Sequence, residues 1–461
     1  MSALILVLAM TGCGGNSPSD STPVPGVYSL SRDSIILPAS PGPAASLSAT
    51  VTITRISGNT GWKLVSSAPW LTLSAAAGSG SGSVTFTAEV NADAARYAII
   101  TLNDAPVCTV CQYDSSAEFT NQAGFAAAIT GAQSSGGTIV LTQNVSYSSG
   151  IAVNGAAITL NLNGCSLNVE TADDRALYVY NGGSLDLAGA GGEFNVTGNI
   201  YGVYTNGPGS RAEVTSAIAT GDGSTGVYAG NSGTVEVSGG VKGGATGANA
   251  YAGGVITVKG DATGNVYGAF ASNGGIVKVG RDAEGGIYGA YANEGSSVEA
   301  GRDAKGGEIG AYAYNRGSII VGRDAAGSQY GVYAERGGST SVGRNAEGNL
   351  CGAYAYYYHD DGEITPSSID VGGDAKGKTG AEALNRGSVT VGGNAAGSEF
   401  GVYVISSGEI TVEGSITVAD GGVYIFANSN RAKGSWDAQI GGYYVYTGSG
   451  SPPSTVRVKI E

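Results

Sequence analysis

A repeat of about 21 residues fills most of this chain and restricts its fold more than any other feature. Its marker is a glycine followed by alanine or valine, and most intervals between markers are 21 residues. The markers are Gly202, Gly226, Gly247, Gly268, Gly289, Gly310, Gly331, Gly352, Gly380, Gly401 and Gly422. A unit this short cannot enclose a core alone, so successive copies must stack. The sequence therefore predicts an all-β chain in which residues 118–461 form a long single-chain parallel β-helix with one coil per repeat.

Each coil contains two runs with strand-like alternation. In the first run, the residues one before, one after and three after the marker share parity, as Tyr288, Ala290 and Ala292 do. Since successive side chains of a strand point to opposite faces, we expect these three to face the interior. A second strand follows with Val298 and Ala300 facing inward. The glycines between the runs are expected to adopt positive φ or to permit close approach between coils.

An aromatic residue recurs two positions after the marker, on the parity opposite to the core. Asn249 and Glu382 interrupt this column. Its members are Tyr204, Tyr228, Phe270, Tyr291, Tyr312, Tyr333, Tyr354, Tyr403 and Tyr424. An exposed stripe of rings at roughly 5 Å intervals suits a repeating glycan, because sugar rings pack their C–H faces on aromatic rings. The candidate glycan-binding residues are Tyr228, Phe270, Tyr291, Tyr312, Tyr333, Tyr354 and Tyr403. Two alternatives stay open: a ladder of rings that stack on one another, or core residues if the parity is reversed.

A column of acids and amides recurs about 14 residues after the marker. It contains Asp261, Asp282, Asp303, Asp324, Asn345, Asp374 and Asn394, and an arginine precedes four of these. Such residues in a repeating turn usually bond to the backbone, so we expect a structural ladder rather than calcium sites. No cofactor or metal is expected; calcium is possible but has no motif in its favour.

The repeat is longest between Gly352 and Gly380, where 28 residues replace 21. The extra residues surround Tyr357, Tyr358, His359, Asp360 and Asp361, which combine rings with carboxylates and the chain's single histidine. This insertion is the candidate for a localised site that binds a sugar or does acid–base chemistry. The alternative is a solvated loop that bulges from one turn.

The N-terminus has the features of an export signal with a lipid anchor. Residues 3–10 form an apolar run too short to span a bilayer, although no Lys or Arg precedes it. Met10, Thr11, Gly12 and Cys13 then resemble the lipobox of bacterial lipoproteins. The resemblance implies a signal peptide over residues 1–12, lipidation of Cys13, and an outer-membrane lipoprotein that faces either the surface or the periplasm. Residues 13–26, rich in Gly, Ser and Pro, are expected to form a flexible tether.

Residues 27–114 alternate short β-rich runs with turns, which predicts a small β-sandwich. Its features in order are Ala68, Pro69, Trp70 and Leu71, a turn at Gly78 and Gly80, Val84 and Phe86, Asn91, Arg96, and a closing run from Val107 to Gln112. This order resembles the BACON family, Bacteroidota-associated modules with an immunoglobulin-like fold that often precede carbohydrate-active domains. The resemblance implies either carbohydrate binding or a spacer role. Trp70 could stack on a sugar, but a tryptophan buried in the sandwich is the favoured interpretation.

The start of the repeat region carries a second resemblance. Phe125 to Ile129 precede the strand-like residues 136–142 and 157–164. This order resembles pectate-lyase-like right-handed β-helices, in which a short helix covers the first coil. At the other end, residues from about Gly441 onward are expected to cap the last coil and block edge pairing.

The net charge of the chain and the regularity of its repeats limit the classes of function that it can have. A net charge of −14 leaves no basic surface for a phosphate backbone, so nucleic acid is not an expected partner. β-Helix folds include polysaccharide lyases and glycoside hydrolases, yet an active site is a single irregular place, whereas the aspartate column recurs in nearly every coil. The favoured hypothesis is a non-catalytic cell-envelope lipoprotein that contacts a polysaccharide, a host glycan or a surface. An enzyme and a structural spacer remain alternatives, and the oligomeric state is left open.

Overall fold

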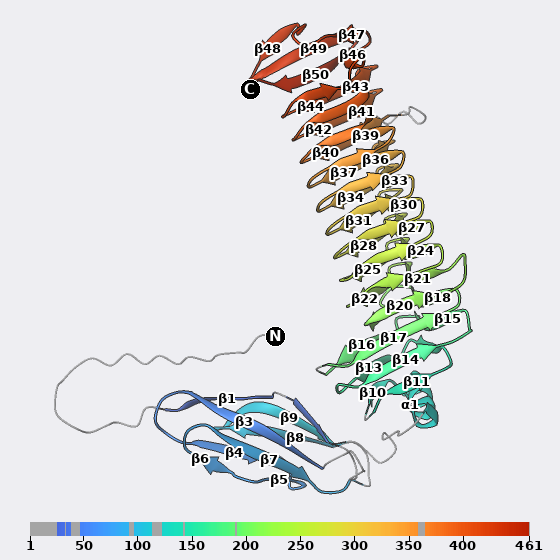
Figure 1. Ribbon diagram of the computed structural model, residues 1–461. Coiled ribbons are helices and arrows are strands. Elements are labelled where there is room, and N and C mark those ends of the chain that lie inside the picture. Colours follow the sequence, from blue (N-terminus) through green and yellow to red (C-terminus); the bar gives the residue numbers. More distant parts are fainter. Residues whose placement is uncertain are drawn as a thin grey trace, which may run out of the picture. The chain divides into compact units, whose positions relative to one another are not determined.

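The computed structural model describes residues 25–32, 34–37, 47–91, 96–112, 122–141, 143–189, 191–357 and 365–460. The chain divides into two compact units, Met1–Glu118 and Phe119–Glu461 (Figure 1). Each unit has its own hydrophobic core. The signal peptide, Cys13 and most of the tether lie outside the described residues.

The first unit contains two β-sheets. One has the order β1-β3-β7-β5 and the other the order β2-β9-β8-β4-β6. The strands are β1 (Val27–Leu30), β2 (Ser34–Leu37), β3 (Ser48–Ser57), β4 (Trp62–Ser66), β5 (Leu71–Leu73), β6 (Ala77–Gly78), β7 (Gly82–Ala88), β8 (Arg96–Leu102) and β9 (Ala105–Gln112). Buried residues of both sheets, Val51 and Phe86 of one and Leu64 and Ile100 of the other, belong to one hydrophobic cluster.

Trp70 belongs to this cluster and is 9% exposed. The Arg96 guanidinium lies 4.6 Å from the centre of its ring. Since its ring is buried and covered by a cation, Trp70 does not offer a surface for a sugar.

The second unit is a parallel β-solenoid of about 13 turns, as the repeat predicts. Helix α1 (Gln122–Ser135) precedes the first coil, and its Phe125 and Ile129 are buried in the solenoid core. Figure 1 shows the coils stacked one above the next along the unit.

One side of the solenoid is a 16-stranded sheet built from the second strand of every coil and extended by the C-terminal strands. In spatial order it contains β10 (Gly137–Val140), β13 (Ala157–Asn161), β16 (Ser184–Ala188), β19 (Arg211–Val214), β22 (Thr234–Val237), β25 (Val255–Val258), β28 (Ile276–Val279), β31 (Ser297–Ala300), β34 (Ser318–Val321), β37 (Ser339–Val342), β40 (Ser368–Val371), β42 (Ser388–Val391), β44 (Glu409–Val412), β50 (Pro453–Lys459), β49 (Tyr443–Gly450) and β48 (Ala438–Ile440).

The remaining solenoid strands form a 25-stranded sheet in which two columns alternate. The column that carries the glycine marker contains β12 (Ile151–Asn154), β15 (Arg175–Tyr180), β18 (Tyr201–Asn206), β21 (Thr225–Gly230), β24 (Thr246–Tyr251), β27 (Tyr267–Ser272), β30 (Tyr288–Ala292), β33 (Ile309–Tyr314), β36 (Tyr330–Glu335), β39 (Cys351–Tyr356) and β46 (Val423–Ala427). The other column contains β11 (Val145–Tyr147), β14 (Ser166–Glu170), β17 (Glu193–Gly198), β20 (Ser216–Ala219), β23 (Val241–Lys242), β26 (Ala262–Gly264), β29 (Ala283–Gly285), β32 (Ala304–Gly306), β35 (Ala325–Gly327), β38 (Ala346–Gly348) and β45 (Ile416–Val418). The two columns merge in β41 (Ala375–Leu384) and β43 (Ala395–Ile405), and β47 (Asn430–Arg431) pairs antiparallel with β46.

Each regular coil therefore has three strands, whereas the sequence predicted two. The additional strand has only three residues in the most regular coils, and its one fully buried side chain is an alanine such as Ala283 or Ala304. A run this short carries no alternation that a sequence pattern can reveal.

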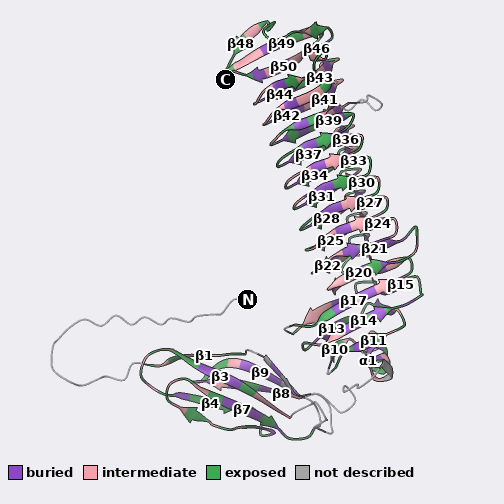
Figure 2. Cartoon of the chain, in the orientation of Figure 1, coloured by how far each residue is buried: buried purple, intermediate pink, exposed green. Residues whose placement is uncertain are grey.

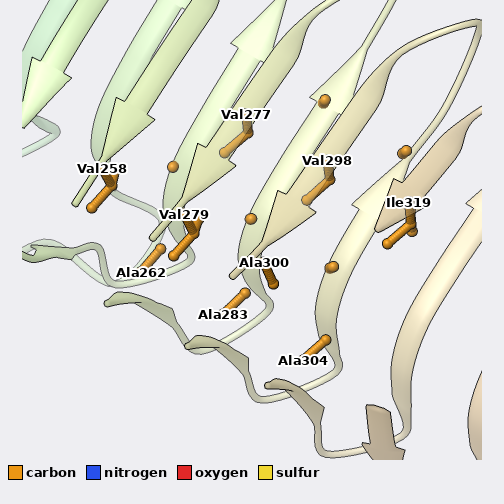
Figure 3. Packing of buried hydrophobic residues seen from close by; sticks show 14 of the residues in the cluster. Val258, Ala262, Val277, Val279, Ala283, Val298, Ala300, Ala304 and Ile319 are labelled. Carbon is orange, nitrogen blue, oxygen red and sulfur yellow. The ribbon is translucent and has the colours of Figure 1, made fainter. Parts of the chain in front are cut away.

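The core consists of small side chains in register. Val277 pairs with Val298, and Val298 pairs with Ile319 of the following coil. Figure 3 shows these residues at equivalent places in successive coils, with Ala283 and Ala304 in a column of their own. Along the strands, buried residues alternate with partly or fully exposed ones (Figure 2).

The alternation that the sequence predicted for the marker strand is interrupted at the glycine marker. Ala290 and Ala292 are buried, as expected, but Tyr288 is only half-buried and stacks on outer rings. A Cβ on Gly289 would lie 2.5 Å from the backbone nitrogen of Lys305, so this residue packs its backbone against the short strand of the same coil. The expectation that the residue before the marker faces the core is therefore wrong for Tyr288, and Phe400, one residue before Gly401, is likewise only half-buried.

Candidate functional site

Two neighbouring columns of aromatic rings cover the outer side of the marker strands; together they are called the aromatic face. The first column is the predicted one, two positions after the marker. The second column is one position before it and was assigned to the core from the sequence. Its members include Tyr201, Tyr267, Tyr288, Tyr330 and Phe400.

Rings of the first column stack on one another from coil to coil. The centres of Tyr291 and Tyr312 are 5.0 Å apart, with 5° between the ring planes, and those of Tyr312 and Tyr333 are 4.8 Å apart. Further contacts of this column join Tyr204 to Tyr228 at 4.6 Å, Phe270 to Tyr291 at 5.2 Å, Tyr333 to Tyr354 at 4.9 Å and Tyr403 to Phe426 at 4.6 Å. Parallel strands hold equivalent residues about 4.8 Å apart, so this stacking follows from the register. The ring faces cover each other, and the side chains present mainly ring edges and hydroxyl groups.

The strand register corrects one member of the predicted column. Tyr403 pairs with Phe426, so Phe426 and not Tyr424 continues the stack. Tyr424 instead packs against the core and contacts the ring of Tyr446.

The two columns also contact each other. Tyr267 stacks on Tyr288 at 5.2 Å, and Tyr288 lies 5.3 Å from Tyr291 of its own coil. Each central ring thus has aromatic neighbours along the stack and beside it, which makes the aromatic face a packed layer over the sheet.

Packing in this layer disfavours ionisation of the phenols. Burial raises the pKa of Tyr228 to about 12, and burial followed by the neighbouring phenols and Glu294 raises the pKa of Tyr291 further. Burial and the nearby Glu335 carboxylate raise the pKa of Tyr312, whose hydroxyl donates to Glu335 Oε2 at 3.0 Å. These hydroxyls therefore act as neutral hydrogen-bonding groups and not as bases.

The first column begins and breaks at polar residues. At its start, the Arg175 guanidinium lies 4.7 Å from the ring centres of both Tyr178 and Tyr204. Asn249 stands in register between Tyr228 and Phe270, and its buried Oδ1 has no hydrogen-bond partner among the described residues. Glu382 stands between Tyr354 and Tyr403, and burial raises the pKa of its carboxyl to about 7.

Most of the predicted insertion site falls outside the described residues. This applies to Tyr358, His359, Asp360 and Asp361. Tyr357 is described and is 7% exposed, and its backbone nitrogen donates to Leu384 O at 3.4 Å. The structure therefore places Tyr357 against the next coil.

The aspartate column forms the coil-to-coil ladder that the sequence favoured. Asp261 Oδ1 accepts the backbone N–H of Asp282 at 3.1 Å, and Asp282 Oδ1 accepts that of Asp303 at the same distance. The ladder continues through Asn345 and Asn394, whose side-chain oxygens accept backbone N–H groups of the following coil. Arginines that precede this column pair with the carboxylate of the previous coil, as Arg344 does with Asp324 at 2.8 Å. These carboxylates thus have internal partners.

Other site types receive no support within the described part of the chain. No group of three or more His, Cys, Asp or Glu there is arranged to hold a metal ion. Cys165 and Cys351 are free thiols. No helix among the described residues has the length and apolar character needed to cross a bilayer.

A cavity of about 320 Å³ lies at the C-terminal end of the solenoid, where the sequence indicated only a cap. It is lined by Gly414, Ser415, Tyr424, Lys433, Gly434, Trp436, Tyr444, Tyr446, Val458, Lys459 and Ile460. The sequence feature that could have indicated this cavity is a tryptophan close to a lysine in a loop that follows the last repeat. It is weak, because the pattern does not reveal which strands will lie beside this loop.

Comparisons with known proteins leave the family open. No protein-family model matches the chain, and no curated protein matches it. A solved structure, the Bacteroides ovatus GH5 xyloglucanase in complex with a XXXG heptasaccharide, is 19% identical over 21% of this chain and 21% of that chain, with a TM-score of 0.17. A likeness this slight carries no argument about fold or function.

Proposed function

We propose that this chain is an exported, non-catalytic lipoprotein, anchored through Cys13 to the outer membrane, whose solenoid contacts carbohydrate or a surface through the aromatic face. In this proposal the first unit is a BACON-like module with an immunoglobulin-like fold that acts as a spacer, because its Trp70 is buried. The second unit is a β-helix related in architecture to pectate lyases but used for binding.

The observation that carries the proposal is the run of ring edges and hydroxyls at one-coil intervals. Stacking covers the ring faces of Tyr291 and Tyr312, so a sugar meets edges and hydroxyls there rather than an open aromatic plane. A glycan whose hydroxyl groups repeat along its length is a suitable partner, because the successive coils that carry Tyr291, Tyr312 and Tyr333 place a neutral phenol at the same position.

A non-catalytic role is favoured by the use of the acidic residues. Glycoside hydrolysis needs two carboxyl groups that flank the scissile bond and are free to exchange protons. The repeated aspartates bond to the next coil and to arginines, and Asp303 for example accepts from both Arg323 and the Asp324 backbone.

The test is a glycan-array screen of the purified full-length protein beside a variant with Tyr291, Tyr312 and Tyr333 all changed to Phe. The variant keeps the stacked rings and loses three hydroxyls, so we expect at least about tenfold weaker binding with an unchanged far-UV circular dichroism spectrum. The matched control changes Ser297, Ser318 and Ser339 to Ala, which removes three hydroxyls at the same coil spacing from the 16-stranded sheet. Equal binding by the native protein and the Phe variant would show that the aromatic hydroxyls are not the contact.

A second candidate function is a structural spacer, and the stacking itself favours it. A ladder in which each ring packs on the next stiffens the sheet without any ligand. Native protein that binds no glycan, and that loses thermal stability when the same three tyrosines become Ala, would support the spacer. Release of soluble sugar from any glycan would instead support an enzyme.

A further inference from the structure

We propose that the cavity at the C-terminal end of the solenoid binds a carboxylated sugar, either free or as the end unit of an acidic glycan. This site is separate from the hydroxyls of the aromatic face. The cavity combines a loop held in place, an exposed tryptophan, and a lysine without an anionic partner among the described residues.

The C-terminal strands build the cavity against the last coils. Strand β50 pairs in parallel with β44, β49 pairs antiparallel with β50, and β48 pairs antiparallel with β49. The loop before β48 is fixed by Asp437, whose carboxylate accepts from Arg431 and from the Thr447 backbone, both at 2.7 Å. The Asp437 backbone nitrogen also donates to Val445 O at 2.8 Å. The neighbouring Trp436 is therefore held in a defined position, as a binding residue must be.

Trp436 is the exposed tryptophan among the three in the chain. It is 42% exposed, whereas Trp62 and Trp70 are 6% and 9% exposed. One side of its indole stacks on Tyr444 with ring centres 5.3 Å apart and 23° between the planes. An exposed, rigidly held aromatic plane beside a cavity is the surface on which the C–H face of a pyranose packs.

Two lysines give the cavity a positive lining in a chain whose net charge is −14. Lys459 pairs with Glu413 at 3.0 Å. Lys433 is exposed and makes no ion pair with any described residue, so its ammonium is available to a ligand. A carboxylate on the sugar would supply the missing anion.

The size of the cavity limits the ligand. About 320 Å³ lies at the lower end of the range typical of small-molecule sites, roughly 300–1,000 Å³. It suits one sugar unit rather than a chain segment, and the combination of ring and cation favours a uronic acid over a neutral hexose.

The experiment titrates the full-length protein with glucuronate and galacturonate oligosaccharides, and with neutral gluco-oligosaccharides, by isothermal titration calorimetry. Tryptophan fluorescence is recorded in parallel, because Trp62 and Trp70 are shielded and a ligand-induced change reports on Trp436. We expect binding of a uronate probe with a shifted emission spectrum, and affinity at least about tenfold weaker for the neutral sugars.

Four variants complete the test. Lys433→Glu should weaken uronate binding at least about tenfold, whereas Lys278→Glu, the same charge change at an exposed position in β28, should leave it unchanged. Trp436→Ala should weaken binding similarly and Trp436→Phe less. If Trp436→Ala misfolds, the Lys433 variant still decides the matter. The proposal is overturned if no uronate binds, or if Lys433→Glu binds as the native protein does.

The proposal for the C-terminal cavity and the proposal for the aromatic face can be tested independently. Changing Tyr291, Tyr312 and Tyr333 to Phe should not alter uronate binding at the C-terminal cavity. A change there would mean that the uronate binds the aromatic face instead, which would also overturn the proposal.

Discussion

Arg323 donates two hydrogen bonds to the carboxylate of Asp303 in the preceding coil, from Nε to Oδ1 at 3.0 Å and from Nη2 to Oδ2 at 2.8 Å. Asp303 Oδ1 also accepts the backbone N–H of Asp324 at 3.4 Å, and the Asp303 N–H donates to Asp282 Oδ1. Burial would raise the pKa of Asp303, but the bonds from Arg323 and Asp324 outweigh it and hold the pKa below its usual value. Asp303 therefore links three coils, through its carboxylate to the following coil and through its backbone N–H to the preceding one.

Two substitutions of Asp303 should separate its charge from its role as a backbone acceptor. Asp303→Asn keeps an acceptor oxygen, as Asn345 does in the same column, and should cost about 1 kcal/mol of unfolding free energy. Asp303→Ala also leaves a backbone N–H without its partner and should cost about 2–3 kcal/mol. Urea unfolding checks this order, and equal midpoints for the two variants would contradict it.

Ile319 and Ile320 are consecutive residues of β34 with opposite environments. Ile319 is 1% exposed and Ile320 is 51% exposed. Ile319→Ala opens a cavity in a core of small side chains and should cost about 2–5 kcal/mol. Ile320→Ala removes the same atoms from the surface and should change the unfolding free energy by no more than about 0.5 kcal/mol. Comparable losses in urea unfolding would mean that the strand register is wrong.

Gly289 should not tolerate a methyl group. A Cβ there would meet backbone atoms of two neighbouring strands at 2.5 to 2.8 Å. Gly289→Ala should therefore cost about 1–3 kcal/mol through overpacking. Gly223→Ala is the control, because a Cβ at that exposed glycine meets nothing within 4 Å. Thermal melting of the two variants measures the difference, and a Gly289 variant as stable as the control would refute the close approach.

Glu382 should make the unfolding free energy depend on pH. Burial raises the pKa of its carboxyl to about 7, above the value near 4.3 of an unfolded glutamate. The folded state thus binds this proton more tightly, so the stability that it contributes is complete below about pH 4 and is lost as the pH rises to about 7. Glu382→Gln should remove a decline of about 1–3 kcal/mol across this interval.

Urea unfolding at several pH values between 4 and 8, in the native protein and the variant, measures the effect of Glu382. The control is Glu299→Gln, a change at an exposed position of β31. A native protein whose pH profile matches that of Glu382→Gln would contradict the burial of this carboxyl between Tyr354 and Tyr403.

Much of the solenoid could be predicted because each repeat places the same kinds of residue in the core and in the turns. The parallel β-helix is confirmed, and so is the turn chemistry: Gly274, six residues after its marker, has a φ of 74°. The ladder through Asp282 could be predicted because short polar side chains in a recurring turn have few other partners than the backbone.

The errors have physical reasons too. Strict alternation of side chains along the strand predicted that Tyr288 lies in the core. The backbone of Gly289 packs against a neighbouring strand and interrupts this alternation, so the buried side chains begin at Ala290. Counting from Gly422 misplaced Tyr424, because only the strand pairing shows that Phe426 follows Tyr403. The cavity beside Trp436 depends on three strands that lie together only in the folded chain. A sequence pattern does not show which strands will be neighbours, so this cavity could not be predicted.

The uniform coil contacts between β25 and β38 have a consequence for how such a chain changes over generations. Val277 meets Val298 as Val298 meets Ile319, and Ala283 meets Ala304 as Ala304 meets Ala325. Excision of one 21-residue unit, such as residues 289–309, would bring matching surfaces together and leave every remaining strand with a partner. Gene duplication or recombination can therefore lengthen or shorten the protein in steps of about 4.8 Å without redesigning its interior, so that its reach evolves separately from its ends.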